Sequence, residues 1–372
     1  MKIGIVGAGL FGCHIACTLH EEGYEVEIIE RYDSIMEGAT RLNQQRLHRG
    51  YHYPRSEETA LECRTGAHEF KRCYPGVTYS GIDRLYAIAK EDSQTSPDEF
   101  EAFMKRMDLE FEEYTKDAPI NRDMVDMIYA VNEESIDPHL LSREVRKNID
   151  DRGIKIRLGT PASEDTLKEY DHVVVCCYDG NNRALADLGM SWRRLPQIQY
   201  ELVEKPVLAM PLGFGYRTSV VIMDGPFCSL DPAGRAGETY LMGHVEHAIL
   251  ARNISVQHNP GSRWKDYVNQ QGIHKATHAW DAMQEAGSKY IPQLAWADRV
   301  GSYYVTRAVR PYREATDERR TIVTPMTSSI TQVFSGKLPS VCQAARDVIA
   351  ILEMQDGSSD LAESHQSAQV SL

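Results

Sequence analysis

The sequence lacks any apolar run long enough to cross a membrane as a helix, because spanning takes about 18 or more consecutive apolar residues and no such run occurs. We also expect no signal peptide, since Gly4 and Gly7 interrupt the apolar start and no small-residue cleavage site follows it. Lysine and arginine are in deficit, 41 against 54 acidic residues, which leaves a net charge of −13. That charge disfavours nucleic acid and anionic membrane surfaces as partners, although local arginines can still bind a small anion.

The sequence has eight cysteines but no CxxC pair and no zinc-ligand spacing. Cys13 and Cys17 fall on one face of an expected helix, where small core residues are a better interpretation than a redox pair. We therefore expect no metal, reduced thiols and a cytoplasmic protein. Internal repeats are absent, and 372 residues of which 42% are apolar can bury a large core, so we expect two domains.

The first thirty residues carry the strongest pattern that is present. The apolar run Lys2–Val6 is followed by the glycine-rich turn 7–12, by apolar residues at helical spacing up to about Gly23, and by a second strand-like run, 25–30. Strand, glycine turn, helix and strand in this order are typical of a dinucleotide-binding βαβ unit. The alternative is a tight strand–helix turn that binds nothing.

Each glycine of this turn has a physical role in that interpretation. Gly7 makes the tight turn, Gly9 lets the backbone approach a pyrophosphate, and Gly12 lets the helix pack against the sheet. The start of the helix offers N–H groups and a partial positive charge to the phosphates. Glu30 lies 21 residues beyond Gly9, where a carboxylate can accept hydrogen bonds from ribose hydroxyls. A carboxylate there argues against a 2′-phosphate, so FAD or NAD is favoured over NADP.

Further strand-like pieces are spread along the chain. An apolar run over 170–177 indicates a buried parallel strand, and 321–323 and 330–334 indicate two more before a closing helix over 339–354. Between them, 191–250 alternates and is broken by glycine and proline, as in an antiparallel sheet, and 261–295 has helical spacing. This interleaving differs from a simple NAD dehydrogenase, whose nucleotide domain is contiguous.

The assembled pattern resembles the D-amino-acid-oxidase-like superfamily of FAD-dependent oxidoreductases, over nearly the whole chain up to about Leu352. The stretches that carry the resemblance are Gly7 to Gly12 with Glu30, Asp137 to Leu141, Val173 to Gly180, and Phe334 to Lys337.

The segment 43–53 looks like the branch that contains L-2-hydroxyglutarate dehydrogenase and the flavin-linked glycerol-3-phosphate dehydrogenases. The matching positions are Asn43, His48, Gly50 and Tyr53. Departures from the branch occur at Gln44, Gln45, Arg46 and His52, where substrate should lie. They leave the flavin assignment intact and bear on the choice of substrate.

The resemblance implies an α/β fold with a Rossmann-like FAD-binding domain built from discontinuous segments and an inserted α+β substrate domain that contains an antiparallel sheet. We expect the FAD-binding domain at 1–76, 127–190 and 300–354, the substrate domain at 77–126 and 191–299, and a disordered tail at 355–372. The expected cofactor-binding residues are Gly7, Gly9, Leu10, Phe11, Gly12, Glu30, Arg31, Asn43, Gly336 and Lys337. No residue is singled out for covalent attachment, so we expect FAD to be bound non-covalently.

The implied chemistry moves a hydride to the flavin and a proton to a base, and histidine is the natural base near neutral pH. If 44–53 runs extended, Arg46, His48, Gly50 and His52 share one face. His48 is the first candidate for the base and His52 the second; the alternative for each is a structural histidine or a flavin contact. The expected substrate-binding residues are Arg46, Tyr53, Arg310 and Tyr312, and the alternative for Arg310 is an ion pair with Asp317 or Glu318.

The leading hypothesis is therefore an FAD-dependent dehydrogenase or oxidase that acts on a CH–OH or CH–NH centre of a small polar, anionic metabolite. The branch resemblance favours CH–OH and the superfamily at large favours CH–NH. The electron acceptor, which could be oxygen, a quinone or another acceptor, is left open. The alternatives are an amine or amino-acid oxidase of the same fold that uses oxygen, a flavin monooxygenase, and a non-catalytic FAD-binding protein. A flavin monooxygenase would usually show a Gly-Asp-Ala turn where this chain has Ser335-Gly336-Lys337.

Overall fold

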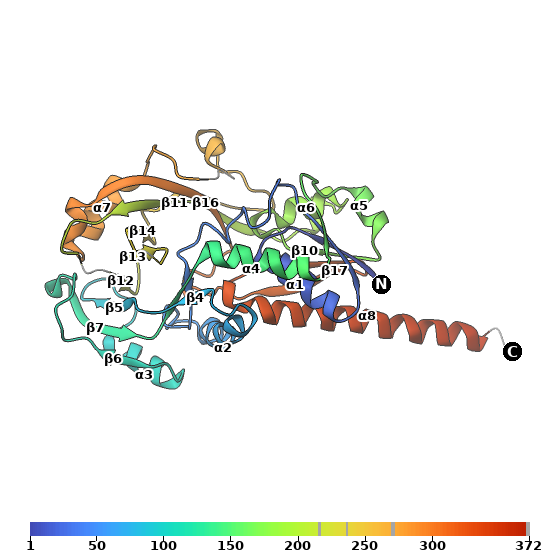
Figure 1. Ribbon diagram of the computed structural model, residues 1–372, viewed down its shortest axis with the longest axis horizontal. Coiled ribbons are helices and arrows are strands. Elements are labelled where there is room, and N and C mark those ends of the chain that lie inside the picture. Colours follow the sequence, from blue (N-terminus) through green and yellow to red (C-terminus); the bar gives the residue numbers. More distant parts are fainter. Residues whose placement is uncertain (215–216, 236, 269–271, 370–372) are drawn as a thin grey trace. The chain divides into compact units, whose positions relative to one another are not determined.

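The computed structural model describes residues 1–214, 217–235, 237–268 and 272–369, with the side chains of the last helix described as far as residue 355. The chain divides into two compact units (Figure 1). The first comprises Met1–Ile35, Val145–Leu195 and Thr321–Leu372, and the second comprises Met36–Glu144 and Pro196–Arg320. Both units are discontinuous, but their boundaries differ from the expected domains, because 36–76, 127–144 and 300–320 belong to the second unit and 191–195 belongs to the first.

The first unit is built on a six-stranded sheet in the order β17-β18-β10-β1-β2-β9. The strands are β1 (Lys2–Val6), β2 (Glu25–Ile29), β9 (Lys155–Arg157), β10 (His172–Val175), β17 (Ile322–Thr327) and β18 (Ile330–Phe334). All neighbours pair in parallel except β17 with β18. Strand β10 is buried along its whole length, as expected for the apolar run at 170–177, because a central parallel strand is covered on both faces.

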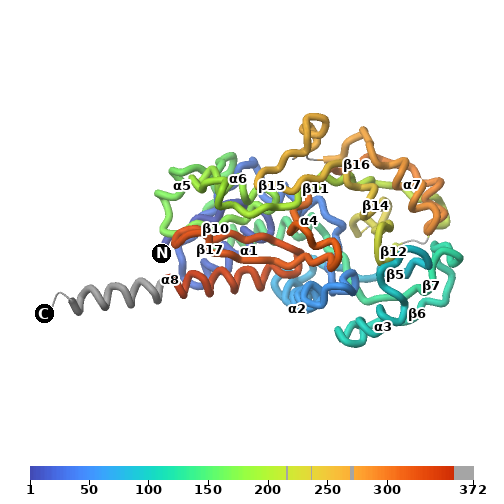
Figure 2. Tube along the Cα trace, turned by 180° about the vertical axis from the view of Figure 1, so that it is seen from behind, coloured from blue at the N-terminus to red at the C-terminus, as the bar shows by residue number. Residues whose placement is uncertain are grey.

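The helices of the first unit are α1 (Leu10–Glu21), α5 (Glu164–Glu169), α6 (Asn181–Asp187) and α8 (Val341–Gln369), with short 3₁₀ turns η2 (Tyr178–Gly180), η3 (Trp192–Arg194) and η6 (Leu338–Ser340). Helices α1 and α8 run side by side (Figure 2). Helix α4 (Pro138–Asp151) spans the boundary between the units. The expected disordered tail is helical over 355–369, as part of α8, and its residues 370–372 lie outside the described residues. None of the described helices is both long and apolar enough to cross a membrane.

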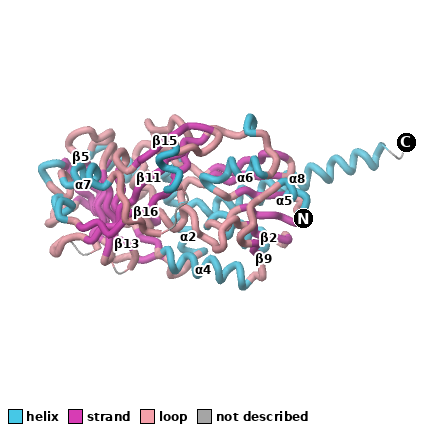
Figure 3. The backbone as a smooth tube through the Cα atoms, turned by 90° about the horizontal axis from the view of Figure 1, so that it is seen from above, coloured by secondary structure: helices cyan, strands magenta, loops and turns pink. Residues whose placement is uncertain are grey.

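The second unit contains a nine-stranded sheet in the order β15-β11-β14-β13-β12-β5-β7-β6, with β16 paired to β11. The strands are β5 (Asp83–Ala89), β6 (Phe111–Glu113), β7 (Val125–Val131), β11 (Ile198–Ala209), β12 (Thr218–Met223), β13 (Cys228–Ala233), β14 (Thr239–His244), β15 (Ile249–Ser255) and β16 (Asp298–Val309). Figure 3 shows β11, β15 and β16 running together. The antiparallel sheet predicted over 191–250 is confirmed, and β5 with β12 is its one parallel pairing among the described strands.

A small three-stranded sheet in the order β3-β8-β4 completes the strands of the second unit. It is formed by β3 (Arg46–Leu47), β4 (Thr78–Tyr79) and β8 (Glu134–Ile136). The helices of this unit are α2 (Glu57–Cys73), α3 (Pro97–Arg106) and α7 (Trp280–Ser288), with 3₁₀ turns η1 (Arg122–Met124), η4 (Ser262–Tyr267) and η5 (Pro292–Trp296). Helix α2 begins where its composition predicts, because the Ser56 side chain accepts a hydrogen bond from Thr59 N.

The predicted helix over 261–295 is wrong for most of its length. Only α7 is α-helical, while η4 is a short 3₁₀ turn and residues 269–271 lie outside the described part. Gly261 and Gly272 both have a φ of +83°, a left-handed conformation that interrupts a right-handed helix. The apolar spacing that suggested a helix comes instead from rings such as Trp264 and Tyr267, which pack edge-on against His278.

Candidate active site

The glycine turn of the first unit leaves no room for side chains. Gly7 has a φ of +106°, and a Cβ on it would lie 2.7 Å from the Cys176 carbonyl oxygen. A Cβ on Gly12 would lie 1.9 Å from the Gly7 carbonyl oxygen, so the first turn of α1 packs directly on the strand–helix turn. Both neighbours are backbone atoms that cannot swing away, so these positions require glycine.

The amino terminus of α1 is suited to an anion. The N-cap residue Gly9 is extended and offers no capping side chain, and the first turn, 10–13, contains no acidic residue. Backbone N–H groups and the helix dipole therefore attract negative charge there. The side chains of Leu10 and Phe11 lie in the core, so these two predicted cofactor residues can contribute only through their backbone.

Glu30 follows strand β2 and is bound to the glycine turn. Its Oε2 accepts a hydrogen bond from Ala8 N at 2.6 Å and its Oε1 accepts one from Tyr32 N at 2.9 Å, while the residue is 8% exposed. The acid therefore lies beside the turn at the carboxyl ends of β1 and β2, as expected for a ribose-binding carboxylate. Arg31 lies over the Tyr32 ring, with its guanidinium carbon 4.7 Å from the ring centre.

The turn at Gly336 and Lys337 joins β18 to η6 and the start of α8. Gly336 N donates to Thr321 Oγ1 at 2.8 Å, and the Ser340 hydroxyl donates to the Lys337 carbonyl oxygen at 2.7 Å. Thr321 Oγ1 and Ser340 Oγ are themselves 2.5 Å apart. The backbone that carries the Lys337 ammonium is thus held at Gly336 N and at the Lys337 carbonyl oxygen, within the first unit.

In the second unit, the segment 43–53 is not the extended strand that the predicted face required. Only Arg46–Leu47 is a strand, and the chain then turns at Gly50, whose φ is +112° and whose carbonyl oxygen accepts from Tyr53 N at 3.0 Å. A Cβ on Gly50 would lie 2.8 Å from the Ala60 carbonyl oxygen, so the turn packs against α2. The turn still keeps His48 and His52 close, with ring centres 5.8 Å apart.

Asn43 uses its side chain within its own loop. Its Nδ2 donates to the Thr40 carbonyl oxygen at 2.5 Å, and its Oδ1 accepts from Gln45 N at 2.6 Å. These bonds hold Gln45 at a φ of +57° just before β3. In this structure Asn43 shapes the loop, and its expected cofactor contact stays a prediction.

Arg46, which was expected to bind substrate, has its guanidinium engaged within the second unit. The residue is 3% exposed, and its guanidinium donates to Asp231 Oδ1 at 2.7 Å, to Ser219 Oγ at 2.9 Å and to the Tyr86 hydroxyl at 2.9 Å. Its donors therefore serve a buried network rather than an open site. A second buried arginine, Arg84, donates to the same Asp231 oxygen at 2.8 Å.

His48 lies next to this network. It is 8% exposed, its Nδ1 is 3.6 Å from Glu133 Oε1, and the Tyr53 ring centre is 6.0 Å away. Burial alone would raise the pKa of the Glu133 carboxyl, but nearby His48 and the charges of Arg46 and Arg84 outweigh burial and hold that pKa far below its usual range. Glu133 is therefore an anion beside His48 at neutral pH.

Tyr53 and Tyr312, both expected to bind substrate, differ in exposure. Tyr53 is 1% exposed, and burial holds the pKa of its phenol well above the usual value. Tyr312 is 73% exposed and has a φ of +61°. Arg310 pairs with Glu318, with its Nη1 2.7 Å from Glu318 Oε1, which is the alternative noted for it from the sequence.

Sequence reasoning missed Glu133, Asp231 and Arg84, the charged residues that surround Arg46. Glu133 stands in an acidic stretch, and Asp231 and Arg84 stand in strands whose local pattern is otherwise apolar. Nothing in their spacing distinguishes them from solvated charges, because what marks them is burial with partners far along the chain.

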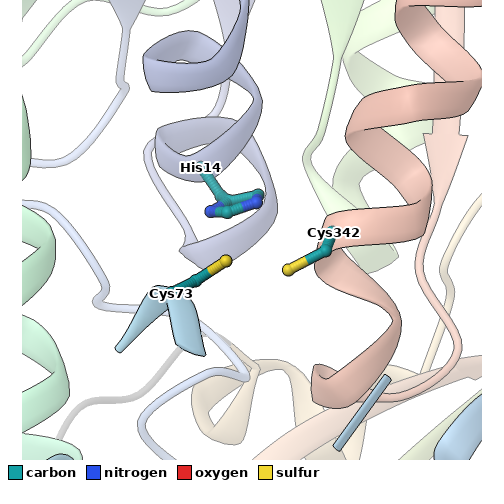
Figure 4. Close-up of side chains that lie close together, drawn as sticks. All are labelled: His14, Cys73 and Cys342. Atoms are coloured by element: carbon teal, nitrogen blue, oxygen red, sulfur yellow. The ribbon is translucent and has the colours of Figure 1, made fainter. Parts of the chain in front are cut away.

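His14 on α1 and Cys342 on α8 approach each other within the first unit, with a ring nitrogen and the sulfur within 4.8 Å (Figure 4). Two ligands do not complete a metal site, and Cys73, which is also labelled there, belongs to the second unit. The expectation that the protein binds no metal therefore stays a prediction.

Comparison with solved structures shows the fold. Glycine oxidase from Geobacillus kaustophilus is 13% identical with a TM-score of 0.66, over 95% of each chain. L-Proline dehydrogenase from P. horikoshii is 13% identical with a TM-score of 0.67, over 96% of this chain and 93% of the other. L-α-Glycerophosphate oxidase from Mycoplasma pneumoniae, solved with FAD bound, is 12% identical with a TM-score of 0.67, over 95% and 94%.

Two characterised fungal proteins are similar in sequence. The FAD-dependent monooxygenase FPY4 of Fusarium mangiferae is 25% identical over 355 residues, 95% of this chain and 91% of the relative. The FAD-dependent monooxygenase kojA of Aspergillus flavus is 25% identical over 381 residues, 95% and 86% of the two chains. The family model for FAD-dependent oxidoreductases, DAO, matches residues 2–332. These matches confirm the predicted superfamily and FAD as its cofactor, and the protein is a member of the DAO family of FAD-dependent oxidoreductases.

Proposed function

We propose that the protein oxidises a CH–OH or CH–NH centre of a small polar, anionic metabolite. The observation that carries this proposal is the placement of His48, a buried histidine beside an anionic carboxylate on the segment 43–53. A histidine so placed can accept the proton that leaves the substrate heteroatom.

The residues of the first unit fit FAD. The glycine turn has no space for side chains, the α1 terminus suits a diphosphate, and Glu30 is positioned for ribose hydroxyls. Bound FAD supplies the hydride acceptor. In this proposal Gly7, Gly9 and Gly12 admit the diphosphate, Arg31 lies on the adenosine side, and Lys337 contributes positive charge that favours a negatively charged ring.

His48 is the proposed base and His52 the second candidate. The substrate's heteroatom proton passes to the imidazole as its carbon gives up a hydride, so the substrate loses two hydrogens and two electrons. Arg310 is the proposed carboxylate ligand, because a guanidinium can bind a carboxylate with two parallel bonds, and it must release Glu318 to do so. Tyr53 and Tyr312 stay in the proposal as substrate contacts, and Arg46 does not.

Whether the substrate is an alcohol or an amine is decided by the substrate screen described below. The glycerophosphate oxidase and glycine oxidase to which this chain is similar are named for a hydroxyl and an amine substrate respectively. The resemblance of 43–53 to the hydroxy-acid branch favours CH–OH. In this proposal the electron acceptor is left open between oxygen, a quinone and another acceptor.

The test is a screen of the purified, FAD-loaded protein. Hydroxy acids, amino acids and amino sugars are mixed with it anaerobically, and the visible absorbance of the flavin is followed. We expect one class to bleach the flavin, and His48→Ala to slow bleaching about 10²-fold or more with FAD content unchanged. Failure of every class would contradict the proposed reaction, and unchanged bleaching in His48→Ala would remove His48 as the base.

A second candidate is a flavin monooxygenase, which the names of the two fungal relatives favour. A monooxygenase needs a reductant and places one oxygen atom of O₂ in its product. The same protein is therefore incubated with NADPH or NADH, candidate substrates and ¹⁸O₂. Pyridine-nucleotide oxidation that depends on substrate, with ¹⁸O in the product, would support this candidate and exclude simple dehydrogenation.

A further inference from the structure

His48 and Glu133 meet because of the register of the small sheet. Strands β3 and β8 are antiparallel, with Arg46 opposite Ser135 and Leu47 opposite Glu134. His48 and Glu133 are the residues next to the Leu47–Glu134 pair, and His48 Nδ1 lies 3.6 Å from Glu133 Oε1. The register of the two strands thus brings these two residues to the same end of the β3–β8 pair.

The Glu133 carboxylate is held at both oxygens. Its Oε1 accepts from Arg49 N at 3.0 Å, and its Oε2 accepts from the Tyr86 hydroxyl at 3.1 Å and lies 3.4 Å from Arg46 Nη1. The Glu133 side chain is fully buried, at 0% exposure. Since its carboxylate cannot rotate without losing these partners, the oxygen that faces His48 keeps its orientation.

The other titratable rings around His48 carry no charge opposite to an imidazolium. The His52 ring centre is 5.8 Å away and the Tyr53 ring centre 6.0 Å, and Tyr53 is neutral at physiological pH because burial raises its pKa. The positive charge of Arg46 is shared between Asp231 and Glu133, through Asp231 Oδ1 and Glu133 Oε2. Glu133 is therefore the anion that acts on His48 at closest range.

We propose that Glu133 is a positioning residue for His48, which holds the proton of His48 on Nδ1 and leaves Nε2 to take the substrate's heteroatom proton. The inference deepens the proposed function and rests on His48 being its base. When Nε2 accepts that proton, the ring becomes an imidazolium, and the adjacent carboxylate stabilises the new charge. The proton stays on the imidazole until the product leaves.

A purely structural role for Glu133 predicts a different effect when Glu133 is replaced. If Glu133 only balanced Arg46 and Arg84, replacing it would lower stability but leave the His48 proton where it was. Asp231 offers a matched control, because it bonds the same two arginines and is likewise buried. Asp231→Asn therefore removes the same charge from the same cluster without removing the oxygen that faces His48.

The test follows His48 directly by ¹⁵N NMR of the FAD-loaded protein, with His48→Ala used to assign the signal. In the wild type we expect neutral His48 to carry its proton on Nδ1. In Glu133→Gln its titration should move to lower pH by about one unit or more, and in Asp231→Asn by clearly less. Neutral wild-type His48 with its proton on Nε2, or equal shifts in both variants, would overturn the proposal.

Flavin reduction gives a second readout. The pH profile of anaerobic reduction in Glu133→Gln should move in the same direction as the NMR titration, with a plateau about 10-fold or more lower, a smaller loss than for His48→Ala. An unmoved profile would overturn the proposal. If Glu133→Gln fails to fold, the tautomer of neutral His48 in the wild type still tests the proposal. Fast flavin reduction in His48→Ala would refute His48 as the base but would not affect the NMR result on Glu133. Failure of the proposed function and failure of the Glu133 proposal are therefore distinguishable.

Discussion

Arg46 and Asp231 form a buried ion pair in the second unit, with Arg46 Nε 2.7 Å from Asp231 Oδ1 and both side chains at most 2% exposed. We expect Arg46→Met to lower the free energy of unfolding by about 3–5 kcal/mol, because removal of one partner leaves buried charge uncompensated. Chemical denaturation measures this loss. Arg41→Met, at an exposed ion pair with Glu37, should change it by less than about 1 kcal/mol; equal losses would contradict the argument.

The contact between Gly12 and the Gly7 carbonyl oxygen predicts loss of the cofactor. In Gly12→Ala the new Cβ would lie 1.9 Å from that oxygen, so α1 must move away from the strand–helix turn. We expect little or no flavin in the purified variant, measured as the ratio of flavin to protein absorbance. Gly38→Ala is the control, because a Cβ there would meet nothing within 4 Å. A fully loaded Gly12→Ala protein would refute the proposed cofactor turn.

Glu30 is predicted to contribute to FAD affinity through its charge. Glu30→Gln keeps the size of the side chain but weakens its bonds to the Ala8 amide and to ribose hydroxyls, so we expect FAD binding to weaken about 10-fold or more. Titration of the apoprotein with FAD, followed by fluorescence, measures the change. Glu25→Gln, at an exposed position of the same strand, should bind like the wild type. Equal affinity of all three proteins would contradict the role of Glu30.

The buried His244 leads us to predict that the folded protein loses stability in mild acid. Burial first, and then the charge of His247, lower the pKa of His244 to about 4 in the folded protein, against about 6.5 in an unfolded chain. Between these values the unfolded state binds more protons, so stability falls as the pH decreases from about 6.5 to about 4.

The variant His244→Asn tests this pH dependence, because its amide oxygen can replace Nδ1 as acceptor for the Glu246 and His247 amides. Relative to this variant, the wild type should lose roughly 2 kcal/mol between pH 6.5 and 4. Denaturation curves at several pH values measure the difference. Parallel pH dependence of the two proteins would show that His244 does not titrate as described.

The local sequence pattern was sufficient to predict the secondary structure at the amino terminus of the first unit. The apolar run, the glycine spacing and the helix that follows predicted β1, α1 and β2 within a few residues, because each of these signals lies between neighbours in the chain. The same reasoning failed over 261–295, where aromatic residues recur at helical spacing but belong to 3₁₀ turns and loops between left-handed glycines. The spacing of apolar residues indicates which side chains are buried, but it does not by itself identify the backbone conformation that buries them.

For the second unit, the sequence predicted which kinds of residue lie together more successfully than it predicted what each of them does. The segment 43–53 does contain the histidines and tyrosines that lie together, but Arg46 points into a buried network and Arg310 pairs with Glu318. A single arginine looks the same in sequence whether it binds substrate or neutralises a buried acid. Only its partners distinguish the two roles, and those partners are up to 185 residues away.

The sequence by itself determined FAD as the cofactor and the strand–turn–helix segment proposed to bind it, because glycine spacing, a helix start and Glu30 act through neighbouring backbone. Tertiary structure alone decided that Glu133 faces His48 and that Asp231 holds two arginines. Those contacts arise from strand pairing between distant segments, where a shift of one residue would place different side chains opposite each other.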